Sequence, residues 1–263
     1  MLRVSENGLV YYQFESLERF GKRGKLQHGV FTRLGGVSAP PFATLNTGHT
    51  VGDDPAAVAE NYRRICGALG VDATSIASGY QVHGVDVAVI GPQDSGHVRP
   101  STDVLVTNQP NIPLMQRFAD CTPLVLYDPV RRALGLAHAG WRGTVRRVAI
   151  EAVRAMGRAF GCRPADIVAG VGPSIGPCCY EIGQVAGQIR KAFPNGDRWL
   201  VVQRSGAVHL DLWSANLQHL QAMGIRQVEV AGLCTACHTE EFFSHRAERG
   251  HTGRFGVLAM LSA

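Results

Sequence analysis

Short apolar runs and longer amphipathic segments are intermixed along the whole chain. Runs rich in β-branched and aromatic residues predict strands over residues 10–14, 29–32, 85–90, 104–107, 123–128, 133–138, 167–171, 199–203 and 228–231. Apolar residues spaced three and four apart predict helices over residues 55–69, 144–160 and 211–222. The order is not a regular strand–helix alternation, so it favours a mixed α/β architecture over a doubly wound sheet. We expect a meander of paired strands in the 100s of the sequence.

The helix predicted over residues 144–160 has the clearest buried face. Gly143 and Thr144 are suited to cap its start. One face collects the apolar residues, namely Val145, Val148, Ala149, Ala152, Val153 and Met156. The opposite face is rich in arginine, which predicts a helix packed on a sheet with one side in solvent.

Length and composition fit one large domain over residues 1–263, with 45% hydrophobic and 18% charged residues. No stretch approaches the roughly 20 apolar residues of a membrane span, and the first residues lack the features of a secretory signal. We therefore expect a cytoplasmic protein that does not enter membranes. A reducing compartment would keep the cysteines as thiols or metal ligands; they are Cys66, Cys121, Cys162, Cys178, Cys179, Cys234 and Cys237.

The net charge of +5 comes from scattered lysines and arginines, so nucleic-acid binding is not expected. The charge fits an anionic small-molecule partner such as phosphate about as well as it fits mere solubility. The glycine-rich loops of dinucleotide-binding and P-loop proteins are absent from the sequence.

Three residues far apart in the sequence form a candidate metal site: His83 in Gln-Val-His-Gly, Cys121 in Ala-Asp-Cys-Thr-Pro and His138 in Ala-His-Ala-Gly-Trp-Arg-Gly-Thr. Two imidazoles and one thiolate suit a catalytic zinc ion, which keeps a fourth position open. Asp120 could orient a ligand or transfer a proton, and Arg142 lies at a strand-to-helix junction suited to anions. Taken singly, each histidine could be a core residue and Cys121 a small buried hydrophobe.

A second group of cysteines has a less certain meaning. Residues 234–238 match the Cys-x-x-Cys-His pattern of haem c attachment, but that chemistry belongs to exported proteins, so we expect the match to be coincidental. A structural zinc on Cys234 and Cys237 would need two further ligands, for which Cys178 and Cys179 are candidates. The role of all four is left open.

Taken together, several segments resemble the YfiH/YlmD family, whose members are also named laccase-domain or polyphenol oxidoreductase proteins. The segments are residues 31–38, 45–46, 51–54, 60–61, 81–84, 119–123, 137–144, 172–181 and 242–254. The resemblance implies a single-domain layered α/β sandwich with mixed β-sheets and flanking helices. It also implies a monomer or homodimer.

The resemblance further implies zinc held by His83, Cys121 and His138, with Asp120 beside it as a fourth catalytic residue. The implied activity is purine nucleoside phosphorylase, acting on adenosine, inosine, guanosine and methylthioadenosine with inorganic phosphate, together with adenosine deamination. Substrate or phosphate binding is carried over to Arg33, Asn46, Arg63 and Arg142. Thr50 and His245 depart from the usual His and Tyr of the family, which bears on substrate preference.

Two alternatives come from other classes of protein. A copper-dependent polyphenol oxidase could use the same three ligands with Met115 as a weak axial ligand, although none of the ten histidines forms the His-x-His pair of a laccase. A non-enzymatic metal-binding interaction module is the other.

Overall fold

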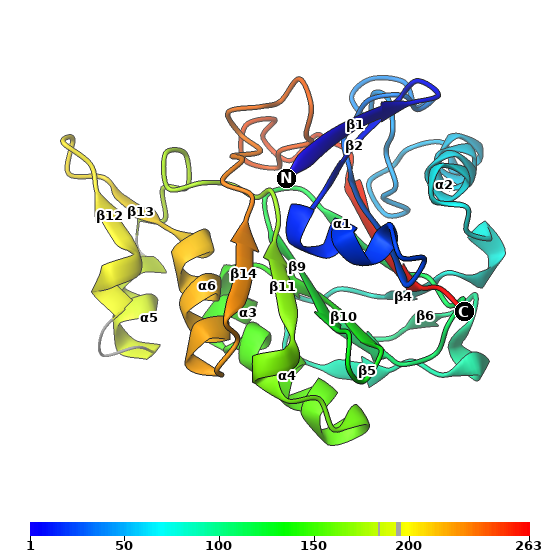
Figure 1. Ribbon diagram of the computed structural model, residues 1–263. Helices are drawn as coiled ribbons and strands as arrows, with labels where there is room; N and C mark the ends of the chain where they lie inside the picture. Colours follow the sequence, from blue (N-terminus) through cyan, green and yellow to red (C-terminus); the bar gives the residue numbers. More distant parts are fainter. Residues whose placement is uncertain (184, 193–195) are drawn as a thin grey trace.

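Two large β-sheets face each other in the computed structural model, which describes residues 1–183, 185–192 and 196–263 (Figure 1). The first sheet consists, in spatial order, of β1 (Leu2–Glu6), β2 (Leu9–Gln13), β3 (Leu26–Phe31), β15 (Phe255–Leu261), β8 (Leu114–Phe118), β4 (Ala77–Gly79) and β6 (Val98–Arg99). The second consists of β14 (Gln227–Val230), β11 (Val168–Val171), β9 (Thr122–Asp128), β10 (Ala133–Ala139), β7 (Val104–Thr107) and β5 (Val87–Val89). Both contain parallel and antiparallel pairs, which confirms the expected mixed sheets.

Helices lie around the two sheets, some on their outer faces and one against the core between them (Figure 1). They are α1 (Glu15–Gly21), α2 (Pro55–Leu69), α3 (Trp141–Val145), α4 (Val148–Phe160), α5 (Val185–Ala192) and α6 (Leu212–Ala222). Helix α2 packs on the first sheet, and α4 and α6 pack on the second. Single 3₁₀ turns are η1 (Ala73–Ser75), η2 (Pro92–Asp94), η3 (Pro164–Asp166) and η4 (Gly196–Trp199), and β12 (Leu200–Val202) pairs with β13 (Val208–Leu210). Within the described ranges, no helix has the length and apolar character needed to cross a membrane.

The layering explains the unbroken apolar runs of the central strands. In β9, Val125 and Tyr127 point into the core between the sheets, whereas Leu124 and Leu126 point toward α4. Both faces of the strand are therefore buried, so the sequence shows a continuous apolar run instead of an alternation. The predicted α/β sandwich is confirmed.

The expected meander in the 100s of the sequence is wrong in one respect. Strands β7, β10 and β9 are neighbours in the second sheet, as a meander requires. Between β7 and β9 in the sequence, however, β8 crosses to the first sheet and pairs with β15 and β4. Because β8 crosses to the first sheet, its residue Arg117 lines the cavity described below.

The single helix predicted over residues 144–160 is in fact two helices. The chain breaks at Arg147, whose φ of 67° is in the left-handed region, and the first helix starts at Trp141 rather than at Thr144. The predicted buried face of α4 is correct, because Val148, Ala152 and Met156 pack on the second sheet. Helix α3 instead packs Trp141 toward the region of α5 and α6.

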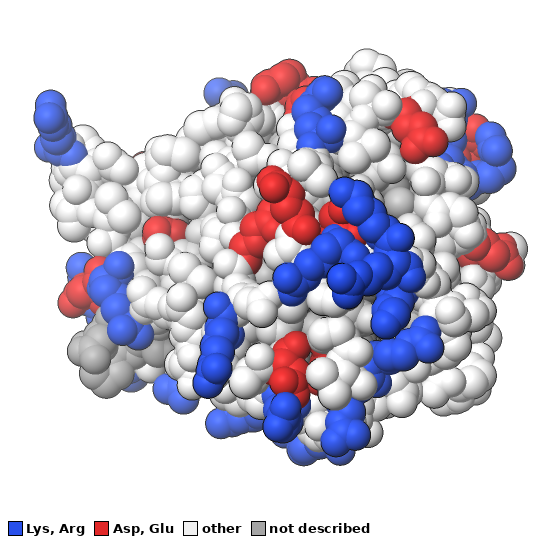
Figure 2. All heavy atoms as spheres, viewed as in Figure 1, with Lys and Arg blue, Asp and Glu red and all other residues white. Residues whose placement is uncertain are grey.

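Several elements have no counterpart in the predicted set, notably α1, α5, β1, β8 and β15. The strand expected over residues 199–203 is β12, which is preceded by η4. Figure 2 shows that on one face the basic side chains gather over and beside α1, with acidic side chains next to them. Lys22 pairs there with Glu18, and the N-terminal amine pairs with Glu15 and Glu229.

Candidate metal and substrate site

Three distant segments bring His83, Cys121 and His138 together. Their ligand atoms all lie within 4.8 Å of one another. Adjacent strands cause part of this convergence: Cys121 immediately precedes β9, and His138 lies in β10 opposite Pro123 of β9. His83 arrives from the loop that follows β4. The set offers two nitrogens and one sulfur, as a metal site with an open position requires.

Asp103, just before β7, positions two of these three ligands. Its carboxylate accepts hydrogen bonds from the backbone N–H of Val82 (3.1 Å), of His83 (3.0 Å) and of Gly84 (2.7 Å). Its Oδ1 also lies 2.8 Å from Nδ1 of His138. A carboxylate that accepts from one ring nitrogen of a histidine leaves the other nitrogen as a metal ligand. The loop bonds also support His83, whose φ of 60° is in the left-handed region.

Gly140 has no side chain, and this leaves room for the ligand cluster. A Cβ atom at this position would lie 2.9 Å from Sγ of Cys121 and 2.9 Å from Cδ2 of His83. Both contacts are closer than real Cβ atoms approach their neighbours, so only glycine lets the His138 strand end pass this close.

Asp120 has a supporting position beside Cys121. Its carboxylate accepts hydrogen bonds from Thr235 Oγ1 (2.7 Å), Ser244 Oγ (2.7 Å) and the backbone N–H of Arg246 (2.6 Å). These bonds tie the C-terminal segment to the residue that carries Cys121. The Asp120 carboxylate therefore fixes the C-terminal segment against the wall of the cavity.

The electrostatics of the cluster favour a charged sulfur. Burial by itself raises the pKa of the Cys121 thiol, but His138 and His83 outweigh it and lower the pKa to about 6. Burial likewise disfavours a charged His138, yet Cys121 and Asp103 raise its pKa to about 9. The two groups stabilise each other's charged forms, and a thiolate is the form that binds metals.

The cluster opens into a cavity of about 890 Å³. Four arginines line it. Their guanidinium groups contact main-chain oxygens, one hydroxyl and one ring: Arg117 donates to Tyr62 Oη and Gly79 O, Arg246 to Glu181 O, Arg254 to Thr252 O and Gly253 O, and Arg142 lies over the Trp141 ring. Among the described residues, none of the four pairs with a carboxylate. The cavity therefore keeps positive charge available for an anion.

The four substrate-binding candidates predicted from the sequence differ in whether they line the cavity. Arg142 lines the cavity. Arg33 instead bonds Ala43 O, Thr239 O and Glu248, and Asn46 is fully buried and holds Gly48 and Asp53. Arg63 is 72% exposed on α2 and pairs with Glu60. Neither Arg33, Asn46 nor Arg63 is among the described residues that line the cavity.

Met115, the axial ligand considered for copper, packs in the core between the first sheet and α2. It is not one of the described residues around the cavity. By contrast, Thr50 and His245, the two departures from the family pattern, both line it.

Asp103 beneath the cluster and Arg117 in the cavity wall have no assignment in the sequence analysis. Tyr180, which also lines the cavity, lies in the family-like segment 172–181. Arg246 and Arg254 lie in the family-like tail, where the sequence offers arginines as phosphate or sugar ligands, and both line the cavity. Asp103 and Arg117 give no local signal, because each acts through residues at least 19 positions away.

A layered α/β fold with a cavity-facing His₂Cys cluster defines a class of proteins suited to bind a metal ion next to a small anionic substrate. The chain belongs to the family described as multi-copper polyphenol oxidoreductase laccase, whose sequence profile matches residues 27–262. Its similarity to YlmD and YfiH proteins confirms the resemblance to that family.

Two relatives and one solved structure illustrate the similarity. A Deinococcus radiodurans protein named purine nucleoside phosphorylase is 43% identical over 88% of this chain and 87% of its own length. Purine nucleoside phosphorylase YlmD of Bacillus subtilis is 37% identical over 86% and 85%. The crystal structure of Bacillus licheniformis hypothetical protein YfiH matches with a TM-score of 0.90 and 35% identity, covering 99% of this chain and 98% of that one.

Proposed function

We propose that the protein is a zinc-dependent purine nucleoside phosphorylase. One observation carries the proposal: the His83, Cys121 and His138 cluster faces a cavity lined by four arginines whose guanidinium groups pair with no carboxylate among the described residues. The names of the relatives support the reaction class, and the donor set fits zinc with an open position.

The arginines bind the phosphate in this proposal. Arg142 and Arg254 offer fixed forks of N–H donors that match phosphate oxygens. A phosphate oxygen attacks C1′ of the ribose, the bond from C1′ to the purine nitrogen breaks, and the base takes a proton as it leaves. Trp141 and Tyr180 line the cavity and provide ring surfaces for the planar base.

A bound zinc ion would supply a Lewis acid at the floor of the cavity. Asp103 keeps His83 and His138 in position for it through the four hydrogen bonds described above. Asp120 is assigned a positioning role, because its two oxygens accept three hydrogen bonds from the C-terminal segment.

The finer part of the proposal covers the substrates adenosine, inosine, guanosine and methylthioadenosine, and a deaminase activity on adenosine. Deamination exchanges the C6 amino group for an oxygen of water and releases ammonia. Its support is the donor set alone, since hydrolysis at a purine carbon is chemistry that zinc sites perform.

The test is an assay of the purified protein with adenosine, with and without inorganic phosphate, following adenine, ribose-1-phosphate and inosine. Adenine and ribose-1-phosphate in equal amounts, only when phosphate is present, are the expected products. Inosine formed without phosphate would report deamination. Without purine turnover at any zinc level, the phosphorylase proposal fails.

The copper oxidase alternative has less support. Among the described residues, the only cluster of three or more potential ligands that includes histidine is His83, Cys121 and His138. Oxidation of a phenol dye that rises with added copper, without purine turnover, would favour it.

A further inference from the structure

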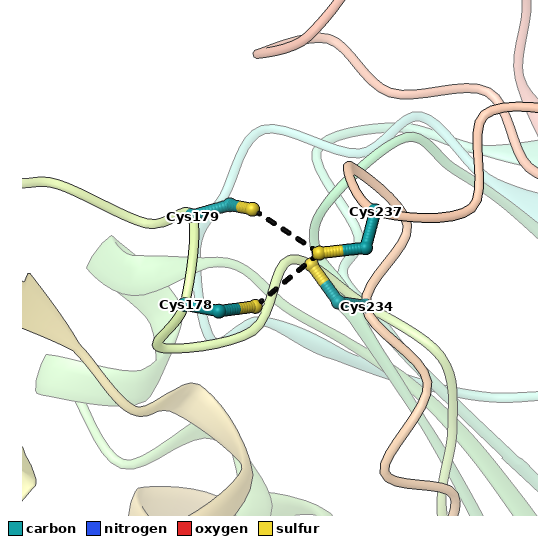
Figure 3. Close-up of side chains that lie close together, drawn as sticks. All are labelled: Cys178, Cys179, Cys234 and Cys237. Atoms are coloured by element: carbon teal, nitrogen blue, oxygen red, sulfur yellow. Dashed lines mark hydrogen bonds between the residues drawn. The ribbon is translucent and has the colours of Figure 1, made fainter.

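Four cysteines outside the cavity converge at one point, although they come from two segments more than 50 residues apart in the sequence (Figure 3). The sulfur atoms of Cys178, Cys179, Cys234 and Cys237 all lie within 4.8 Å of one another. Sγ of Cys237 is 3.5 Å from that of Cys178 and 3.4 Å from that of Cys179. Figure 3 shows all four side chains pointing into the same space.

Burial in an apolar core does not explain why these four thiols lie together. A free cysteine normally behaves as a small buried hydrophobe, and Cys234 is buried in that way. Cys178 and Cys237, however, are exposed, and Cys179 is only half-buried. Thiols that gather at the surface need a partner other than the apolar core.

Each pair is displayed by a tight turn whose backbone is already fixed. On one side, the backbone N–H groups of Cys179 and Tyr180 both donate to Gly176 O. On the other, those of Cys237 and His238 both donate to Cys234 O. A third contact joins the turns, because the N–H of Gly176 donates to Sγ of Cys234 over 3.2 Å. Such an N–H to sulfur bond stabilises a thiolate and orients it as a ligand.

The spacing of the sulfurs selects a single ion over a cluster. With a metal–sulfur distance of about 2.3 Å, tetrahedral geometry puts the four sulfurs about 3.8 Å apart. The two separations of 3.4 Å and 3.5 Å at Cys237 lie just below this value, and the limit of 4.8 Å for all four sulfurs lies above it. Thiolates on the different irons of an iron–sulfur cluster lie farther apart, because the cluster separates them. The Cys-x-x-Cys spacing of Cys234 and Cys237 is also that of structural zinc sites.

We propose that these four cysteines form a second metal site, which holds one zinc ion in a closed tetrahedral Cys₄ arrangement. The four thiols release their protons on binding, and the four thiolates with Zn²⁺ carry a net charge of −2, which the exposed side of the site leaves open to water. No oxidation is involved. The site is independent of the activity proposed above.

Its position suggests what the ion does. Residue 180, next to Cys179, is a tyrosine that lines the cavity. Thr235, next to Cys234, donates to the carboxylate of Asp120 beside the first cluster. An ion shared by the two turns therefore joins two walls of the cavity from outside, as a structural zinc does.

The experiment counts zinc in protein purified under anaerobic reducing conditions, using elemental analysis after gel filtration. We expect two zinc ions per chain in the unmodified protein, one in Cys121→Ala, one in the double variant Cys178→Ser/Cys237→Ser, and none when all three substitutions are combined. Cys162→Ala is the matched control, because it removes a thiol from neither cluster and keeps two ions.

Cobalt substitution of the unmodified chain and of Cys121→Ala gives a second measurement. Thiolate-to-cobalt absorption per ion should be about four times stronger at a four-thiolate site than at a one-thiolate site, so Cys121→Ala should keep most of the total. One zinc per chain that disappears in Cys121→Ala would overturn the proposal, as would a disulfide from Cys237 to Cys178 or Cys179 in the anaerobic protein. Loss of purine turnover alone bears only on the proposed activity.

Discussion

The two sulfur-containing clusters of this protein have similar compactness and different surroundings. In both, all ligand atoms lie within 4.8 Å of one another. The His83, Cys121 and His138 cluster has mixed donors, a supporting carboxylate and an open cavity with four arginines. The four-cysteine cluster has only soft donors held on two turns, and none of its members lines the cavity among the described residues. Compactness alone therefore does not distinguish a reactive site from a structural one; the donor atoms, the open position and the charges around it do.

The strongest test of this distinction compares one ligand from each cluster. Cys121→Ala should lower kcat/KM for phosphorolysis by on the order of 10³-fold or more, because it removes a ligand that faces the substrate. Cys237→Ser should lower it by less than about tenfold, because that cluster lies outside the cavity. Initial rates with adenosine and phosphate give both values. Equal losses in the two variants would remove the distinction.

Asp103→Asn tests whether support from a carboxylate is particular to the cavity cluster. Replacing a hydrogen-bond partner of a ligating histidine typically costs about 10- to 100-fold in metal affinity. We expect that loss at the cavity cluster, measured by competition with a chromogenic chelator in the Cys178→Ser/Cys237→Ser background. The four-cysteine site, measured in the Cys121→Ala background, should be unaffected. Equal weakening of both sites would mean that Asp103→Asn disturbs the whole fold.

His28 is a reference for a histidine whose pKa is set mainly by burial. It is 1% exposed, and its Nε2 accepts the N–H of Phe14. Burial lowers its pKa from 6.5 to about 4, so the unfolded chain binds the proton first as the pH falls. Stability from this group is complete above pH 6.5 and declines toward pH 4, by about 2 kcal/mol between pH 7 and pH 5.

Denaturant unfolding of the unmodified protein and of His28→Gln at these two pH values measures that loss. The variant should lose about 2 kcal/mol less than the unmodified chain between them. Parallel losses in the two proteins would contradict the assignment. The pKa of His138 is raised instead of lowered, because Cys121 and Asp103 next to it favour its charged form.

The smallest expected effect concerns phosphate. Arg142→Met should raise the KM for phosphate about tenfold, which corresponds to the loss of one charge-assisted hydrogen bond. Arg63→Met is the matched control, because Arg63 is exposed and pairs with Glu60 away from the cavity; it should change KM by less than twofold. A larger effect from Arg63→Met would place phosphate elsewhere.

Local signals made part of the fold predictable. Helix α2 agrees with its predicted range because Asp54 caps it through Ala56 N and Gly70 ends it in a left-handed conformation. Strands β9 and β10 were predictable because burial on both faces demands continuous apolar runs. Their adjacency also brings Cys121 next to His138.

The remainder depends on distant pairings that no local pattern contains. Strand β15 pairs with β8 and places Gly256 opposite Arg117, so Arg117 and Arg254 reach one cavity across more than 130 residues of sequence. The break at Arg147 was equally invisible, because a helical pattern of apolar residues continues through it. The convergence of Cys178 and Cys179 with Cys234 and Cys237 needed the bridge between Ser174 and Cys234.

Asp103 has a consequence for the thermodynamics of ion capture. One carboxylate fixes a loop 20 residues earlier in the sequence and a side chain 35 residues later. These bonds form when the chain folds, so the loss of loop entropy is already complete before an ion arrives. Binding an ion then requires little further ordering of His83 and His138, and more of the intrinsic ligand affinity appears as measured affinity.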